Sequence, residues 1–357
     1  MNTRGKALGR LAILLVVLAV AALAVAGVFG SRMNKKDSAG FRADLSGFES
    51  AAYARAGNGF AAVSGVSCRL YGANGDVLQT VSRSYSDVQI VGAEGCAAVW
   101  SEGGTGLTLL IGEQAKDLTF SGGVTGVDIN DECTAAVLAG ENGYKGSVSV
   151  YNGSGDGIYR VYVGSGYPVD AAVSPDSRSV AILSLTAEGS AVSVYRLDSE
   201  KAAAEYLEEG CSCFDLQYLS DGRLLLLSAD RAVFLKDDGR LLGRWEFGGE
   251  YLKDYAAGDG FVCLLLGRYH AGTGGRIVLL DTTGTVTAQQ ELSGDAEGVS
   301  AAGKNLALRF ADRTAVYDLG LTELGSREST SSVQAVMMRP NGGALIISGG
   351  KAAIFEP

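Results

Sequence analysis

The chain has 357 residues, of which 47% are hydrophobic, 51 are glycine and only 4 are proline. This composition indicates a turn-rich folded protein with a substantial core and excludes collagen-like and disordered chains. The formal net charge is −10, and the single histidine, His270, leaves too few histidines for a multi-histidine metal site and disfavours a Ser-His-Asp or Cys-His catalytic set.

The N-terminal region contains one long apolar run. Residues 11–29 carry no charged or amide side chain over 19 positions, and as a helix they would extend about 28 Å, a full hydrocarbon crossing. We predict a transmembrane signal anchor at 11–29, a cytoplasmic head at 1–10 and a linker at 30–40. The alternative is a cleaved signal peptide, because Ala24-Val25-Ala26 fits a small-x-small cleavage site.

The charged residues are distributed unevenly along the chain, with a basic region around this run and an acidic region after it. Residues 1–36 contain six Lys or Arg and no acid, so with a total of −10 the remaining residues carry −10 − 6 = −16. Three basic residues on each side of the run do not fix its orientation. The short head and large body favour a single-pass protein of the cell membrane with its C-terminal body outside the cytoplasm. The acidic body disfavours nucleic acid as a partner.

The body consists of one repeated unit. A turn followed by an apolar run occurs as SPDSRSVAILSL (174–185), LSDGRLLLLSA (219–229) and RPNGGALIISG (339–349), and weaker copies precede and separate these. The residue after the Asp or Asn equivalent of the turn falls at Gly59, Gly95, Glu132, Ser177, Gly222, Gly260, Gly303 and Gly342. A period of about 40 residues is that of a four-stranded propeller blade. We predict an all-β, eight-bladed β-propeller over residues 41–357, with seven blades as the alternative.

The last unit, residues 332–357, has room for three strands only. Phe41, Ala43 and Leu45 alternate in the segment 41–48, which could supply the missing outer strand. We therefore predict a shared closing blade formed by 41–48 and 332–357, which would remove a free sheet edge.

The six cysteines lie mostly in apolar strand patterns without the even spacing of a disulfide scaffold. We predict buried free thiols. Cys211 and Cys213 would point to one face of a strand, a poor geometry for bridging each other.

Candidate binding residues lie at one rim of the predicted ring. The loops after outer strands and between second and third strands share that rim, and Tyr and Arg there provide large contact area with a polar end. The loop RYHAGTGG (268–275) is the preferred candidate for a contact site. For each single tyrosine, the alternative interpretation is that its ring packs between blades. The predicted binding residues are Arg83, Tyr85, Tyr144, Tyr167, Tyr251, Arg268, Tyr269 and His270.

Acidic groups are interpreted as structural. Asp128, Asn130, Asp131 and Glu132 align with an ordinary inter-strand turn and lack the distal Glu of a calcium loop. The pairs at 208–209 and 237–238 are interpreted as solvated surface charge rather than as glycosidase carboxylates. We assign no catalytic residue and no metal ligand, and we expect no cofactor.

The turns S-P-D-S-R and L-S-D-G-R resemble WD40-like repeats of bacterial exported propellers. The arrangement of basic head, apolar span and acidic propeller resembles a domain-of-unknown-function family of membrane-anchored propeller proteins in Gram-positive bacteria. The resemblance implies an architecture and no catalytic residues. We expect a non-catalytic binding or scaffold module for an envelope protein, peptide or glycan, with an extracytoplasmic hydrolase or lyase using rim or pore carboxylates as the alternative.

Overall fold

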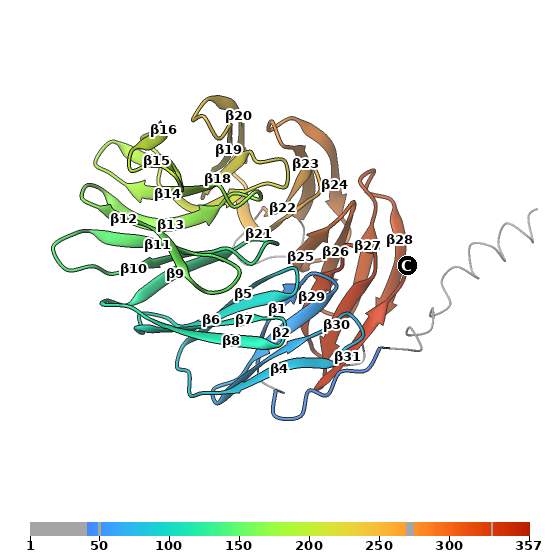
Figure 1. The fold of residues 1–357 in the computed structure, drawn as a ribbon. Helices are drawn as coiled ribbons and strands as arrows, with labels where there is room; N and C mark the ends of the chain where they lie inside the picture. The colour runs from blue at the N-terminus through green and yellow to red at the C-terminus, as the bar shows by residue number, and fades with distance from the viewer. Residues whose placement is uncertain (1–40, 49–50, 269–274, 330) are drawn as a thin grey trace, which may run out of the picture.

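The computed structural model describes residues 41–48, 51–268, 275–329 and 331–357. Within these residues the secondary structure is entirely β, and eight antiparallel sheets lie around a common centre (Figure 1). Seven sheets have four strands and the last has three. The prediction of an all-β, eight-bladed propeller is confirmed.

Each blade is formed by strands consecutive in the chain. Blades 1 to 4 contain, in order, β1 (Ala52–Ala56), β2 (Gly59–Val63), β3 (Ser67–Tyr71), β4 (Val77–Ser82); β5 (Val88–Ala93), β6 (Cys96–Ser101), β7 (Gly106–Ile111), β8 (Gln114–Thr119); β9 (Val124–Ile129), β10 (Ala135–Ala139), β11 (Gly146–Tyr151), β12 (Gly157–Val163); β13 (Tyr167–Val173), β14 (Ser179–Leu185), β15 (Gly189–Arg196), β16 (Ala202–Glu209).

Blades 5 to 8 continue this order. They contain β17 (Cys213–Tyr218), β18 (Leu224–Ser228), β19 (Arg231–Leu235), β20 (Leu241–Glu246); β21 (Tyr251–Gly258), β22 (Phe261–Gly267), β23 (Gly275–Asp281), β24 (Val286–Leu292); β25 (Ala296–Ala302), β26 (Asn305–Phe310), β27 (Arg313–Tyr317), β28 (Glu323–Glu328); β29 (Val333–Met338), β30 (Ala344–Ser348), β31 (Lys351–Phe355).

The core lies between neighbouring blades. Second strands are buried on both faces, as the continuous apolar sequence LLLLS of β18 requires. Outer strands such as β8, with the sequence QAKDLT, are mostly exposed and polar. One cluster joins Leu225 of β18 to Leu264 of β22 and Val278 of β23, so side chains of blade 5 pack against blade 6.

The repeated turn between first and second strands needs a left-handed backbone. Gly222 has φ +81° and Gly260 has φ +81°, a conformation that glycine adopts without a Cβ clash. Ser177 occupies the equivalent position in blade 4 with φ +56°. The repeat that predicted the blades is therefore a repeat of this turn geometry.

The ring closes differently from the prediction. Residues 41–48 form no strand, and the last sheet has three strands. Leu45 and Phe48 are buried in a cluster shared by blades 1 and 8. The Tyr71 hydroxyl donates to the Asp44 carbonyl at 2.6 Å. The segment thus covers the junction of the first and last blades by side-chain packing rather than by strand pairing.

A buried arginine also joins these two blades. Arg339, in the turn between β29 and β30, donates through Nε to the Asn58 carbonyl at 2.8 Å and through Nη2 to the Ala73 carbonyl at 2.9 Å. Its guanidinium satisfies two turn carbonyls of blade 1, which fixes blade 8 against the start of the ring.

One disulfide links blades 2 and 3. Cys96 and Cys133 are bonded, with Cα atoms 5.9 Å apart, so the prediction of free thiols is wrong for this pair. They occupy neighbouring positions of adjacent repeats and face each other across the blade interface. Cys68, Cys211, Cys213 and Cys263 are buried free cysteines, as predicted.

The predicted N-terminal anchor lies outside the described residues. The residues that the structure describes contain no helix with the length and hydrophobicity of a membrane span.

Candidate functional site

The connections between strands form two opposite rims of the ring. We call loop rim the side formed by the segments after each fourth strand and between each second and third strand. In blade 3 these are residues 164–166 and 140–145. We call turn rim the side formed by the segments between first and second strands and between third and fourth strands, such as 130–134 and 152–156.

Three exposed tyrosines gather on the loop rim where blade 3 meets blade 4. Tyr144 lies in the loop before β11, Tyr162 on β12 and Tyr167 at the start of β13, and they are 50%, 48% and 62% exposed. The rings of Tyr144 and Tyr162 are 4.8 Å apart between centroids. We call these three side chains, with Lys145 and Arg160, the tyrosine patch.

Two cations hold the patch together. Lys145 Nζ lies 4.5 Å from the centre of the Tyr167 ring and 3.2 Å from its hydroxyl oxygen, so it joins the loop of blade 3 to blade 4. Arg160 lies 6.0 Å from the centre of the Tyr162 ring, and its Nε donates to Ser149 Oγ at 2.8 Å. Interaction with the Tyr162 side chain raises the pKa of Arg160, so its charge is maintained.

Close backbone packing brings the two blades together at the patch. A Cβ on Gly146 would lie 2.9 Å from Pro168 Cγ, so only glycine allows this approach of β11 to β13. The position of Tyr167 beside Lys145 follows from that contact.

A groove opens beside Tyr162. Its volume is about 500 Å³, within the range of ligand sites. One wall is the end of β12 and the loop after it, and the other is the face of blade 4. It is lined by Tyr162, Val163, Gly164, Ser165, Ile182, Ser184, Thr186, Glu188, Ala191, Val192, Ser193, Tyr195, Glu205, Tyr206 and Leu207.

Arg83 and Tyr85 also lie on the loop rim, but their polar groups are used inside the protein. Arg83 makes a double ion pair with Asp117, at 2.7 and 3.0 Å. The Tyr85 hydroxyl lies 3.2 Å from Thr108 Oγ1, and burial raises its pKa. These contacts connect the start of blade 2 to its own outer strands.

The remaining predicted residues lie near blade 6. The Tyr251 ring packs so closely on Gly267 that a Cβ there would approach it to 2.5 Å. Arg268 pairs with Glu291 at 2.8 Å. Tyr269 and His270 lie outside the described residues, so the binding role of this loop stays a prediction.

The inner strands carry carboxylates, which the enzymatic alternative would need. Asp128 accepts the Val173 N–H, Asp170 accepts the Leu216 N–H and Asp254 accepts the Val299 N–H, each at 2.8 Å. Each of these bonds joins one blade to the next. The carboxylates therefore serve as connections between blades.

The turn at 130–134 is confirmed as a turn. Asn130 Nδ2 donates to the Ser174 carbonyl and to Ser177 Oγ, both at 2.8 Å. Asp131 Oδ1 accepts the Glu94 N–H at 2.9 Å. The polar cluster of this segment thus connects blades 2, 3 and 4.

Glu208 corrects the interpretation of the acidic pairs. It is 2% exposed, and its carboxylate accepts from Arg244 Nε at 2.9 Å and lies 3.4 Å from Arg231 Nη1. Glu208 is therefore a buried ion-paired group between blades 4 and 5 rather than solvated charge. Asp237 and Asp238 are exposed, as predicted.

Tyr162 is the patch residue that the sequence analysis missed. It lies within the polar outer strand β12, whereas the predicted binding residues lie in loops and at strand starts. The pattern of two tyrosines in GIYRVYV, directly before the loop at 164–166, is the signal that could have identified it.

Comparison of the fold with solved structures finds propellers at low sequence identity. The C-terminal WD40 domain of Sif2 has a TM-score of 0.59 and 13% identity, over 85% of this chain and 94% of that one. Sqt1 of Chaetomium thermophilum, solved with the N-terminus of ribosomal protein L10, has a TM-score of 0.58 and 12% identity over 90% and 100%. BamB from Moraxella catarrhalis has a TM-score of 0.55 and 13% identity over 90% and 97%.

At these identities the likeness shows the fold alone. No curated protein sequence matches the chain. The sequence model of DUF5711, a family of unknown function, matches residues 38–352, and the chain therefore belongs to that family.

Proposed function

We propose that this protein is a non-catalytic binding module that presents the tyrosine patch to an extended polypeptide segment of an envelope protein. The observation that carries the proposal is the gathering of three exposed tyrosines from two blades beside a groove of about 500 Å³. Tyrosine combines a large apolar surface with a polar end and is enriched among residues that dominate interfaces.

The groove suits a polypeptide because its blade 4 wall presents both apolar and hydroxyl side chains. Apolar side chains such as Ile182 and Leu207 alternate there with the hydroxyls of Ser184 and Ser193. An extended segment presents side chains and backbone polar groups in alternation, so both kinds of lining group would find partners. Sqt1, which has a similar fold, was solved bound to the N-terminus of ribosomal protein L10, and this supports a protein segment as the ligand.

The proposed setting is the outer face of the cell membrane. The uncharged run at 11–29 and the −16 charge of the remainder support a single-pass anchor with the propeller outside the cytoplasm. The ring would then be held near the membrane by the linker at 30–40.

The test replaces Tyr144, Tyr162 and Tyr167 together by alanine in the full chain. Exposed positions shift stability by about 0.5 kcal/mol or less each, so folding should persist. Recovery of cross-linked partners from membranes should fall more than about tenfold, because each anchor contributes about 2 kcal/mol.

A matched control carries V77A, V286A and L324A, which remove three exposed apolar side chains from outer strands. The control should recover the same partners as the native chain. Equal recovery by the tyrosine triple variant, with an unchanged thermal midpoint, would contradict the proposed site.

A further inference from the structure

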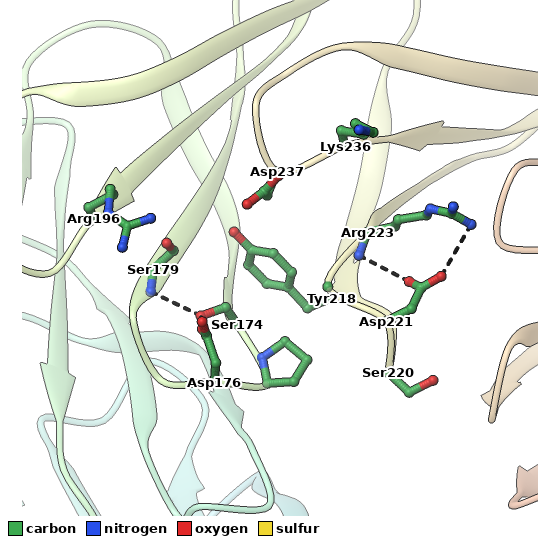
Figure 2. Close-up of a pocket in the computed structure, with 12 residues that line it drawn as sticks. Ser174, Asp176, Ser179, Arg196, Tyr218, Ser220, Asp221, Arg223, Lys236 and Asp237 are labelled. Atoms are coloured by element: carbon green, nitrogen blue, oxygen red, sulfur yellow. Dashed lines mark hydrogen bonds and ion pairs between the residues drawn. The ribbon is translucent and has the colours of Figure 1, made fainter.

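A polar cleft lies on the turn rim between blades 4 and 5, opposite to the tyrosine patch. Its volume is about 560 Å³, within the range of small-molecule sites. One wall consists of the turn 174–178 with Arg196 at the end of β15. The other consists of the turn 219–223 with Lys236 and Asp237 after β19 (Figure 2).

The walls of the cleft are held in place by their own turns. Ser174 Oγ accepts the Ser179 N–H at 2.9 Å and donates to Asp176 Oδ1 at 2.7 Å. Asp221 accepts the Arg223 N–H at 3.1 Å and pairs with its guanidinium at 3.2 Å (Figure 2). Polar groups arranged before binding lose little freedom when a ligand arrives.

One lining group has unused hydrogen-bonding capacity. The Tyr218 hydroxyl is buried and has no hydrogen-bond partner among the described residues. Figure 2 shows its ring among the lining residues with the hydroxyl end toward Asp237. Burial, with the charges of Asp237 and Asp176, raises the pKa of Tyr218, so it stays a neutral donor. A buried unpaired hydroxyl is unfavourable, and a ligand oxygen would satisfy it.

The second unused group is the ammonium of Lys236, which forms no ion pair with another described residue. It lies on the same wall as Asp237, so the cleft offers a free donor beside an acceptor. Tyr218, Lys236 and Asp237 all come from blade 5, whereas Ser179 lines the cleft from blade 4 (Figure 2).

The charges of the cleft indicate the class of ligand. Arg196, Arg223 and Lys236 are matched by Asp176, Asp221 and Asp237. This balance and the acidic body disfavour a phosphate or other dianion, and the polar lining disfavours an apolar molecule. Hydroxyl groups, which donate and accept at once, suit a lining of mixed donors and acceptors. We propose that this cleft binds a neutral saccharide of one or two rings.

This proposal does not depend on the function of the tyrosine patch, because the two sites occupy opposite rims. The experiment uses the full chain solubilised without a sugar-headed detergent, and the probes are cellobiose, maltose and di-N-acetylchitobiose, each titrated by calorimetry. At least one should bind saturably. Y218F and K236M should each weaken that binding about tenfold, the effect of one lost hydrogen bond.

Y317F and K351M provide matched controls, since they make the same chemical changes in blades 7 and 8, outside both the cleft and the tyrosine patch. Both should bind the saccharide as the native chain does. The proposal is overturned if none of the three sugars saturates, or if Y218F and K236M bind unchanged while retaining the native thermal midpoint. Saturable binding of inorganic phosphate without any sugar binding would also overturn it, because the ligand class would then be wrong.

Discussion

Asp170 shows how a single side chain can fix the arrangement of two blades. Its two oxygens accept the N–H groups of Ala171, in its own strand, and Leu216, in the next blade. Asp254 repeats the arrangement with Tyr255 and Val299. A carboxyl group with two oxygen atoms can thus position the inner strands of neighbouring blades relative to each other.

These carboxylates predict a pH-dependent stability. Burial, with the nearby charge of Asp215, raises the pKa of Asp170 to about 8, and burial raises that of Asp128 to about 6. The folded state therefore binds protons more tightly than the unfolded state, so stability falls as pH rises toward each value. Between pH 6 and 8 Asp170 should contribute a decline of no more than about 1.4 kcal/mol per pH unit.

The measurement is the thermal midpoint from pH 5 to pH 9. D170N should flatten the decline between pH 6 and 8, because its amide does not titrate there. D198N, which changes an exposed aspartate, should follow the native curve. The same slope in D170N as in the native chain would show that another group titrates.

At the site, the sequence was informative about which residues occur on the loop rim but not about their contacts. Tyr144 and Tyr167 lie together in the patch, whereas Arg83 is paired with Asp117, which is 34 positions further along the chain. An ion pair between separate strands leaves no local signal in the sequence. Which side chain an Arg or Tyr contacts depends on how neighbouring strands are aligned, and this register exists only in the folded sheets.

Among the elements, the segment 41–48 has the most unusual role, because it supports the ring without joining a sheet. Phe48 is 1% exposed, and the Arg69 guanidinium lies 4.7 Å from the centre of its ring. Tyr53 donates to the Phe48 carbonyl at 2.5 Å. The segment is therefore tied to blade 1 by hydrogen bonds as well as by apolar contact.

We expect F48A to lower the free energy of unfolding by about 3–5 kcal/mol, because it opens a cavity between blades 1 and 8. F214A should cost far less, since Phe214 is 51% exposed. Chemical denaturation of both variants measures the difference. Equal midpoints would mean that the segment contributes little to closure.

Deletion variants extend this test to the whole segment. Removing 41–48 should destabilise the ring far more than removing 31–39, because the former carries Leu45 and Phe48 into the core. A greater loss on removing 31–39 would place the closing element in the linker instead.

The strands and turns could be predicted because a short stretch of sequence determines each of them. The closure of the ring could not, because it depends on contacts between residues far apart in the chain. An Asp or Asn beside a residue that tolerates positive φ, followed by an apolar run, marks a turn and a buried strand wherever it occurs. The alternation of apolar residues at Phe41, Ala43 and Leu45 also fits the pattern of a strand, although the segment forms none. The segment packs on the ring without forming a strand, and Tyr71 and Arg69 hold it there by donating hydrogen bonds to the Asp44 carbonyl.

At the scale of the whole molecule, the proposed setting predicts which parts a protease can reach. If the body lies outside the cytoplasm, protease added to intact wall-stripped cells should digest residues beyond about 40 while the residues before them stay with the membrane. Immunoblotting with separate N- and C-terminal tags measures this. A protected body would overturn the outside placement, and a released body beginning near Gly27 would indicate cleavage after Ala26.

The bond between Cys96 and Cys133 also affects how the propeller would respond to a pulling force. Because the two positions are 37 residues apart, the covalent loop contains one complete repeat. If the two ends of the chain were pulled apart, the residues between the two cysteines could not extend while the disulfide is intact. At about 3.5 Å per residue they account for about 130 Å of extended polypeptide. If the ring is tethered to the membrane as proposed, a pulling partner would extend the chain to its full length in two stages, the second only after the disulfide is reduced.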